Sequence, residues 1–161
     1  MVAAGLLVLR LTLAFVLISH GGHVLFGLGA GGGLGAGGLD EAAARYAKAG
    51  LEPGYVVAVI VGVVQFVGGL LIAVGLLTRW AALATVLLLT ILLWRQQAQW
   101  GFYMNWLGDP TRGHGMEFSL ALIGALCCML LTGPGEWSFD GRRAYTVASR
   151  AAGRARLRGR A

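Results

Sequence analysis

Four apolar stretches, each close to the length of a membrane-spanning helix, constrain this chain more than any other feature of its sequence. They cover roughly residues 4–26, 55–77, 80–95 and 117–133. A bilayer core is crossed by about 20 mostly apolar residues in an α-helix. Only 12% of the residues are charged and 57% are hydrophobic, against about 25% charged in soluble domains. The sequence therefore predicts an all-α fold, an integral membrane four-helix bundle.

The connection between the first two spans has two parts. Residues 27–38 contain eight glycines in twelve positions, which leaves the backbone too free to hold a helix. Residues 40–50 place acids first, bases near the end and Gly50 last. This order complements the helix dipole and stops the helix. We expect a short interfacial helix here, in the first outer loop.

The other two connections differ in length. Only Leu77, Thr78 and Arg79 join the second span to the third, so these spans must be antiparallel neighbours. The third and fourth spans are separated by residues 96–116, a polar and aromatic segment. We expect this segment to fold back over the mouth of the bundle.

Residues 1–141 are predicted to form the four-transmembrane-helix domain, and residues 142–161 a basic cytoplasmic tail. The seven arginines of this tail supply most of the basic character behind the net charge of +6. Four spans place both termini on one side, which then receives eight Lys and Arg residues against four on the other. The positive-inside rule thus predicts a multi-pass protein of the cell (inner or plasma) membrane with both termini cytoplasmic. Membrane lipid, not nucleic acid, is the expected partner of the tail.

Small and polar residues recur at helical spacing in two of the spans. They are Ala58, Gly62, Gln65 and Gly69 in the second span, and Glu117, Ala121, Gly124 and Cys128 in the fourth. Small residues let helices approach closely in lipid, and polar residues bond across the contact. Both stripes are therefore expected to face inward.

Ionisable residues inside a span are costly and are candidates for functional sites. Arg10 lies about 15 Å deeper than His20 at 1.5 Å per residue, and Gln65 lies nearer the midplane. We expect Arg10 and Gln65 to form the polar interior of the bundle, with Gln65 and backbone carbonyls as acceptors for Arg10. Alternatively, Arg10 reaches back to the headgroups, and Gln65 either only joins helices or contacts a ligand.

A second group of polar residues falls near the outer boundary. These residues are His20, His23, Arg95, His114 and Glu117. We expect them to converge beneath the aromatic loop, where His20 and Glu117 would be the catalytic or proton-exchanging groups. Spacing of three residues within the pairs His20–His23 and His114–Glu117 suits metal ligation. Gly21 and Gly22 loosen the first pair and the sequence fixes no acidic partner, so no metal site is predicted. Alternatively, Glu117 caps the fourth helix.

Several short stretches carry a resemblance to a known family through their order and spacing. They are 9–11 and 19–27 in the first span, 65–69 and 75–79 around the second, 101–106 in the third loop, and 116–119 and 133–140 at the end. In these residues the chain resembles the DoxX family of small bacterial and archaeal four-helix membrane proteins, over roughly residues 5–141. The family commonly has lysine at the position of His23 and often glutamate at that of Gln65. These differences disfavour a metal at His23 and proton handling at Gln65.

The resemblance implies a role in association with membrane oxidoreductases. Members are linked to thiosulfate:quinone oxidoreductase and terminal quinol oxidase subunits, and others to complexes that deal with thiol or oxidative stress. The sequence contains no haem, flavin or iron–sulfur motif. Any electrons would therefore be carried by another subunit or by a diffusible quinone.

The expected function is a DoxX-like subunit that binds a quinone or similar lipophilic ligand and serves a membrane oxidoreductase. The residues expected to assist His20 and Glu117 in binding are Arg95, Phe102, Trp106 and His114. Expected partners are other membrane or peripheral subunits, or further copies of this chain. The alternative is a non-catalytic accessory or assembly subunit whose polar residues only join helices. A small-solute transporter is disfavoured because no inverted repeat with broken helices is present.

Overall fold

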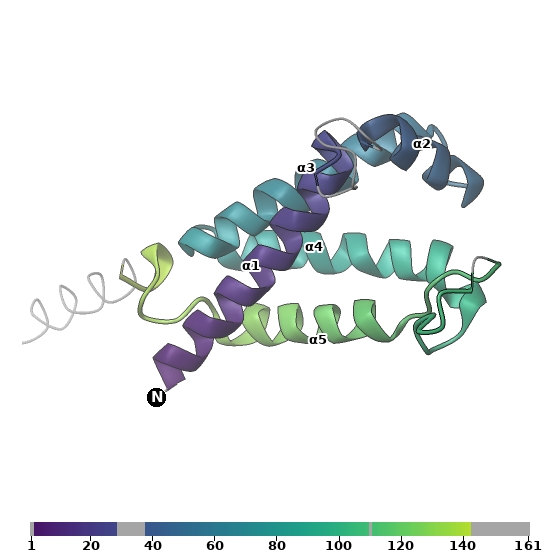
Figure 1. Cartoon of the computed structure of the whole chain (residues 1–161). Helices are drawn as coiled ribbons and strands as arrows, with labels where there is room; N and C mark the ends of the chain where they lie inside the picture. Colours follow the sequence, from purple (N-terminus) through teal and green to yellow (C-terminus); the bar gives the residue numbers. More distant parts are fainter. Residues whose placement is uncertain (1, 29–37, 110, 143–161) are drawn as a thin grey trace, which may run out of the picture.

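The computed structural model describes residues 2–28, 38–109 and 111–142. Within these ranges every regular element is helical, as expected (Figure 1). The elements are α1 (Val2–Phe26), α2 (Gly38–Lys48), α3 (Gly54–Val74), α4 (Thr78–Leu92), a π-helical turn η1 (Leu93–Gln97), a 3₁₀ turn η2 (Ala98–Trp100) and α5 (Glu117–Thr132). Most of the glycine-rich connection, and the predicted tail beyond Arg142, lie outside the described residues.

Three of the four predicted spans are long and apolar enough to cross a membrane. They are α1, α3 and the continuous helical segment from Thr78 to Trp100. The third span is longer than expected because η1 and η2 extend α4 beyond residue 95. The fourth, α5, has 16 residues and rises about 24 Å at 1.5 Å per residue. Its length is therefore less than the thickness of the bilayer core, but it still packs within the bundle.

The ends of α3 and α2 follow from local chemistry. Gly75 ends α3 in a left-handed conformation with φ of 75°, and its N–H donates to the carbonyls of Leu71 and Ile72, a common helix C-cap. The helix α2 is strongly amphipathic, and it buries Ala42 and Tyr46 against the bundle. The expected short helix is thus present, and its buried face is fixed to α1 and α3.

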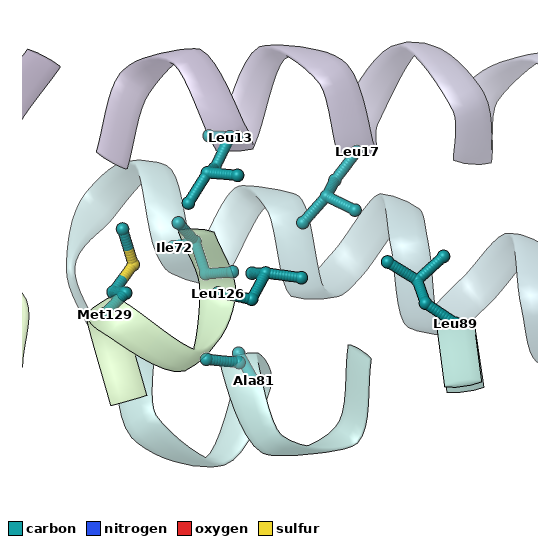
Figure 2. Close-up of a cluster of buried hydrophobic side chains, with 9 residues drawn as sticks. Leu13, Leu17, Ile72, Ala81, Leu89, Leu126 and Met129 are labelled. Carbon is teal, nitrogen blue, oxygen red and sulfur yellow. The ribbon is translucent and has the colours of Figure 1, made fainter. Parts of the chain in front are cut away.

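The helices form a bundle in which α1 crosses the others obliquely (Figure 1). The main contact of α1 is with α3, and α4 packs against both α3 and α5. The contact between α1 and α5 is much less extensive. The main core lies between these helices and includes Leu13, Leu17, Ile72, Leu126 and Met129 (Figure 2). Tight apolar packing of this kind is the main force between helices in lipid.

The stripe of small residues predicted in the second span is buried, as expected. Ala58 is fully buried, and Gly62, Gln65 and Gly69 lie on the same buried face of α3. A methyl group on Gly69 would lie 2.8 Å from a side-chain carbon of Ile18. The stripe therefore lets α1 and α3 approach closely.

The stripe predicted in the fourth span does not face inward, so that expectation is wrong. Ala121, Gly124 and Cys128 are exposed, and no atom from another part of the described chain lies within 4 Å of a methyl group placed on Gly124. The residues that α5 buries are Ser119, Leu126 and Met129. Because α5 is apolar around most of its circumference, periodicity could not select its packing face. Large side chains determined it instead.

Candidate functional site

A cavity of about 760 Å³ lies at the end of the bundle opposite the termini of the described chain. Its apolar walls come from α1, α4 and α5 and include Leu17, Leu89 and Leu122. The helix α2 and parts of residues 96–104 and 113–115 surround the rest. The loop between the third and fourth spans does fold back over the bundle, as expected. A cavity of this size and lining is typical of sites for small organic ligands.

Polar side chains from every side also line this cavity. They are His20, His23, Arg45, Tyr46, Lys48, Gln65, Gln96, Gln97, Gln99, His114 and Ser119. No Asp or Glu is found among the lining residues within the described parts of the chain. Three predicted site residues, His20, His114 and Gln65, are therefore brought to one cavity that is rich in hydrogen-bond donors.

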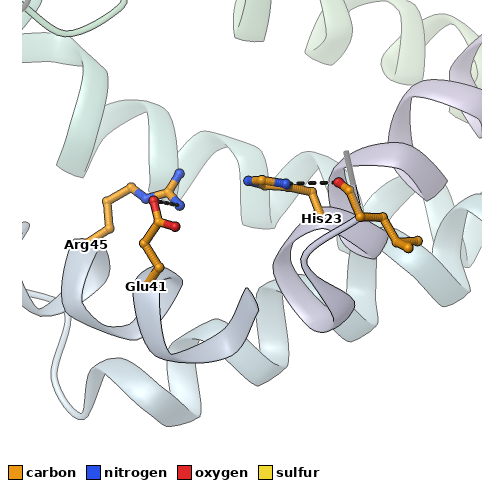
Figure 3. Close-up of polar contacts among 4 residues, drawn as sticks. His23, Glu41 and Arg45 are labelled. Atoms are coloured by element: carbon orange, nitrogen blue, oxygen red, sulfur yellow. Dashed lines mark hydrogen bonds and ion pairs between the residues drawn. The ribbon is translucent and has the colours of Figure 1, made fainter. Parts of the chain in front are cut away.

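The two histidines of α1 have different surroundings. The His20 ring lies against Phe118 of α5, with ring centroids 6.0 Å apart. The Nδ1 atom of His23 lies 3.1 Å from the carbonyl oxygen of Leu28, and Arg45 pairs with Glu41 at 3.7 Å on α2 (Figure 3). Across the described ranges no group of three His, Cys, Asp or Glu side chains is placed to hold a metal ion. Of the two histidines of α1, His20 is therefore the one whose ring nitrogens have no hydrogen-bond partner in the described structure, since His23 lies against Leu28.

Glu117 does not line the cavity, and its carboxylate instead holds the loop that forms one wall. Its Oε2 atom accepts a hydrogen bond of 3.2 Å from the N–H of Met104. The backbone N–H of Glu117 donates to the carbonyl of Phe102 at 2.9 Å, and that of Met116 to the carbonyl of Gly101 at 3.1 Å. These bonds fix residues 101–104 against the start of α5.

The three other residues assigned to ligand binding also lie outside the cavity lining. The Nη2 atom of Arg95 donates to the carbonyl of Gly50 at 2.7 Å, which ties η1 to the end of α2. Phe102 is exposed and its ring packs edge-on against Tyr103. Trp106 is 77% exposed. Phe102, Tyr103 and Trp106 therefore do not line the cavity, whereas Trp100 of the same segment does.

Arg10 lies at the other end of the bundle and is only 3% exposed. Its Nη1 atom donates to the carbonyl of Pro134 at 3.0 Å and its Nη2 atom to that of Trp137 at 2.8 Å. The expected backbone acceptors are confirmed, and the alternative in which Arg10 extends to the headgroups is wrong. Gln65 is not an acceptor for Arg10, because it faces the distant cavity. The two residues therefore do not share one polar interior.

A second link secures the segment that contains Pro134 and Trp137. The sequence did not predict it. The Oδ2 atom of Asp140 accepts hydrogen bonds from the N–H of Thr78 at 3.0 Å and from its hydroxyl at 3.2 Å. Asp140 thus caps the start of α4 from 62 residues away in the chain. Its own N–H donates to the carbonyl of Gly75 at 3.0 Å. We call Arg10, Thr78 and Asp140, with the carbonyls that they bind, the terminal clamp.

Two residues of the cavity were also missed as candidates. Tyr46 lies on the buried face of α2, where an aromatic residue at helical spacing is normally part of the core. Ser119 lies in the first turn of α5 and is 6% exposed. The sequence pattern that could have indicated both residues is a polar group on an otherwise apolar, inward-facing stripe of a helix. Burial raises the pKa of the Tyr46 phenol, against the weaker opposing effect of the Arg45 charge.

The comparisons with known proteins agree with this architecture. The DoxX family model matches residues 5–95, which covers α1, α2, α3 and α4. A membrane protein of Mycobacterium tuberculosis, described as uncharacterized, is 33% identical over 101 residues, or 61% of this chain. The match spans 62% of that protein's length. No solved structure matches. Because the family match extends over more than half of the chain, this helical membrane protein belongs to the DoxX family.

Proposed function

We propose that this protein binds a quinone or similar lipophilic ligand in its cavity and serves a membrane oxidoreductase as the ligand-binding subunit. The observation that carries the proposal is a cavity of about 760 Å³ that combines leucine walls with many polar side chains. A quinone has the matching chemistry, since an apolar ring and tail carry two carbonyl oxygens that accept hydrogen bonds. The DoxX family's association with membrane oxidoreductases supports this choice.

The lining suggests how such a ligand would be held. Leu17, Leu89 and Leu122 would contact the ring and tail. Histidine is suited to proton exchange near neutral pH, so we assign this role to His20 and His114, which line the cavity. Glu117 is assigned the positioning of the loop, because its carboxylate binds the backbone of Met104.

The proposed setting is the inner or plasma membrane with both termini cytoplasmic and the cavity facing outward. This orientation rests on the arginines near the chain's end and on Arg79. Reporter fusions at Ala161 and within residues 29–37 should report opposite sides, with the former inside. An exterior signal from the fusion at Ala161 would overturn this orientation.

Ligand content of the purified protein tests the function. We expect protein isolated in mild detergent to retain extractable quinone, and His20→Ala to lower the amount retained at least severalfold. Phe15→Ala provides a control on the same helix, because Phe15 is 73% exposed and does not line the cavity. Equal quinone content in wild type, His20→Ala and His114→Ala would overturn the assigned histidine roles. Absence of quinone binding in all three would overturn the proposed function.

The second candidate, a non-catalytic accessory subunit, has specific support in three polar residues. Arg10, Arg95 and Glu117 all bind backbone groups of distant segments and so act as structural links. This candidate predicts a stable larger membrane complex whose assembly depends on these links and whose isolation yields no bound quinone. Affinity purification with subunit identification and lipid extraction separates the two functions.

A further inference from the structure

Three polar side chains from three different helices line the cavity without a partner. Tyr46 of α2 and Gln65 of α3 are each 7% exposed, and Ser119 of α5 is 6% exposed. All three belong to the cavity lining. The side-chain polar atoms of these three residues form no hydrogen bond with any other residue in 2–28, 38–109 and 111–142. Their polar atoms are not fully enclosed by protein, unlike the Nε atom of Arg10, so they remain open to the cavity.

The other buried polar residues show that this lack of partners is unusual in the protein. Besides Tyr46, the buried polar and charged residues are Arg10, Gln65, Thr78, Thr85, Ser119 and Ser138. Four of these six donate side-chain hydrogen bonds, to Pro134, Asp140, Ala81 and Gly135 among others. The two that do not, Gln65 and Ser119, both line the cavity.

Unpartnered groups of this kind are poorly suited to a structural role. A polar side chain stabilises helix association in lipid by bonding across the contact, and these three side chains bond no other described residue. Tyr46, Gln65 and Ser119 therefore do not act as links between helices. Their hydrogen-bonding capacity is left for whatever molecule fills the cavity.

The turn η1 contributes two glutamines to the same lining, each with an unpartnered polar atom that the protein encloses. The Nε2 atom of Gln96 and the Oε1 atom of Gln97 are buried, and neither has a partner in the described structure. Both residues lie in the π-helical turn Leu93–Gln97 and line the cavity. Single π-helical turns within α-helices are frequent at functional sites, because they change the directions in which successive side chains point.

The chemistry of the three groups indicates what they would bind. Two hydroxyls and one primary amide can all donate hydrogen bonds. Burial raises the pKa of Tyr46, so its phenol keeps its proton at neutral pH and remains a donor. Arg45 and Lys48 also line the cavity, and Arg45 is paired with the Glu41 carboxylate outside the lining at 3.7 Å.

We propose that Tyr46, Gln65 and Ser119 form the subsite for the polar head of an apolar ligand, and that this head presents oxygen acceptors to them. The inference rests on the proposed function in requiring the cavity to bind a ligand, and it deepens that function by naming the head-group contacts. Carbonyl oxygens of a quinone and the carboxylate of a fatty acid share this chemistry. The experiment below distinguishes these two sources.

The test removes each donor with little change in volume and measures binding and stability separately. Detergent-purified, delipidated protein is titrated with decylubiquinone and, in parallel, with palmitate. The variants are Tyr46→Phe, Gln65→Leu and Ser119→Ala. Matched controls are Tyr55→Phe and Ser19→Ala, because Tyr55 and Ser19 are exposed and lie outside the cavity lining.

We expect each cavity variant to weaken binding of the preferred probe about tenfold, the equivalent of about 1.4 kcal/mol. We expect the ligand-free variants to unfold at about the same temperature as wild type, because the removed groups bond no other described residue. Neither control should change binding. This combination of weaker binding and unchanged stability is the signature of a ligand contact and not of a helix link.

The outcomes separate this inference from the proposed function. Binding of palmitate alone, weakened by the three variants, would overturn the quinone proposal and support the subsite with a carboxylate head. Decylubiquinone binding that is equal in wild type and all three variants would overturn the subsite and leave the function standing. A clear loss of stability in the ligand-free variants, or failure of both probes to bind wild type, would also overturn the subsite.

Discussion

The two ends of this bundle use buried polar residues in opposite ways. In the terminal clamp, the guanidinium of Arg10 and the carboxylate of Asp140 bind backbone groups that lie far away in the chain. At the cavity, the side chains of Tyr46, Gln65 and Ser119 are nearly as buried as that of Arg10 but form no hydrogen bond with any other described residue. The comparison teaches that burial of a polar group in a membrane helix does not by itself reveal its role. Its partners decide whether it contributes to stability or is left for a ligand.

The largest expected effect comes from breaking the terminal clamp at Arg10. Arg10→Leu should destabilise the protein by about 2 kcal/mol, because two bonds from a charged donor, each contributing about 1.5–3 kcal/mol, are lost. The lower cost of inserting leucine in place of a charge offsets part of this loss. Thermal and denaturant unfolding in detergent measure the change.

Arg10→Lys supplies the matched comparison, since lysine keeps the charge but not the two-armed geometry. It should fall between wild type and Arg10→Leu. If Arg10→Leu were as stable as wild type, the contrast between the two ends of the bundle would fail.

A smaller loss is expected for Asp140→Ala, which removes the cap on the first turn of α4. Loss of an N-terminal cap costs about 1 kcal/mol, and Asp140→Asn should cost less because it retains an acceptor oxygen. Combined with Arg10→Leu, the effect should be less than additive, since both residues secure residues 134–140 to the bundle. A fully additive pair would show that Arg10 and Asp140 act independently.

At the cavity end, Glu117→Ala should loosen the loop without unfolding the bundle. The bond from Met104 to Glu117 is 3.2 Å long, and losing it should cost about 1 kcal/mol. Hydrogen exchange at the Met104 amide should quicken in Glu117→Ala and stay near wild type in Glu117→Gln, which keeps an acceptor. Ligand binding should persist in Glu117→Gln. Its loss there would restore Glu117 as a direct ligand contact.

The smallest effect concerns the exposed tip of the same loop. The Thr111 side chain and backbone donate to the Asp109 carboxylate at 2.7 and 2.8 Å and lower its pKa below the ordinary value of 3.8. Because the folded pKa is the lower one, the contribution of Asp109 is complete above pH 3.8 and is lost as the pH falls further. Amide protection in residues 105–112, measured relative to the intrinsic exchange rate at each pH, should therefore fall below this pH. Asp109→Ala should show the lower protection at every pH.

Sequence reasoning was most successful where a local property decides the structure. Apolar length predicted the spans, and the order of charges predicted α2. The cost of a charge in an apolar run singled out Arg10 as a residue that needs partners. Its acceptors in residues 134–137 are 124 and 127 positions away, so local pattern could only suggest backbone carbonyls in general and, wrongly, Gln65.

The candidate site was predicted less completely, because closeness to one end of the bundle was the main guide. That criterion included His20 and His114, which line the cavity, and also Arg95, Phe102, Trp106 and Glu117, which do not. It left out Tyr46 and Ser119. Residues at the same depth can face a cavity, the loop or the surroundings, and depth along a helix carries no information about this choice.

The sequence by itself determined that this chain is a helical membrane protein with a costly arginine and a few polar residues within its spans. Apolar length and charge act through the local backbone and the bilayer, so no other part of the chain is needed to evaluate them. Only the tertiary structure decided which buried polar groups find partners and which face the cavity. That outcome depends on the rotation of each helix about its axis, and α5 shows that rotation is set by the packing of large side chains against neighbouring helices.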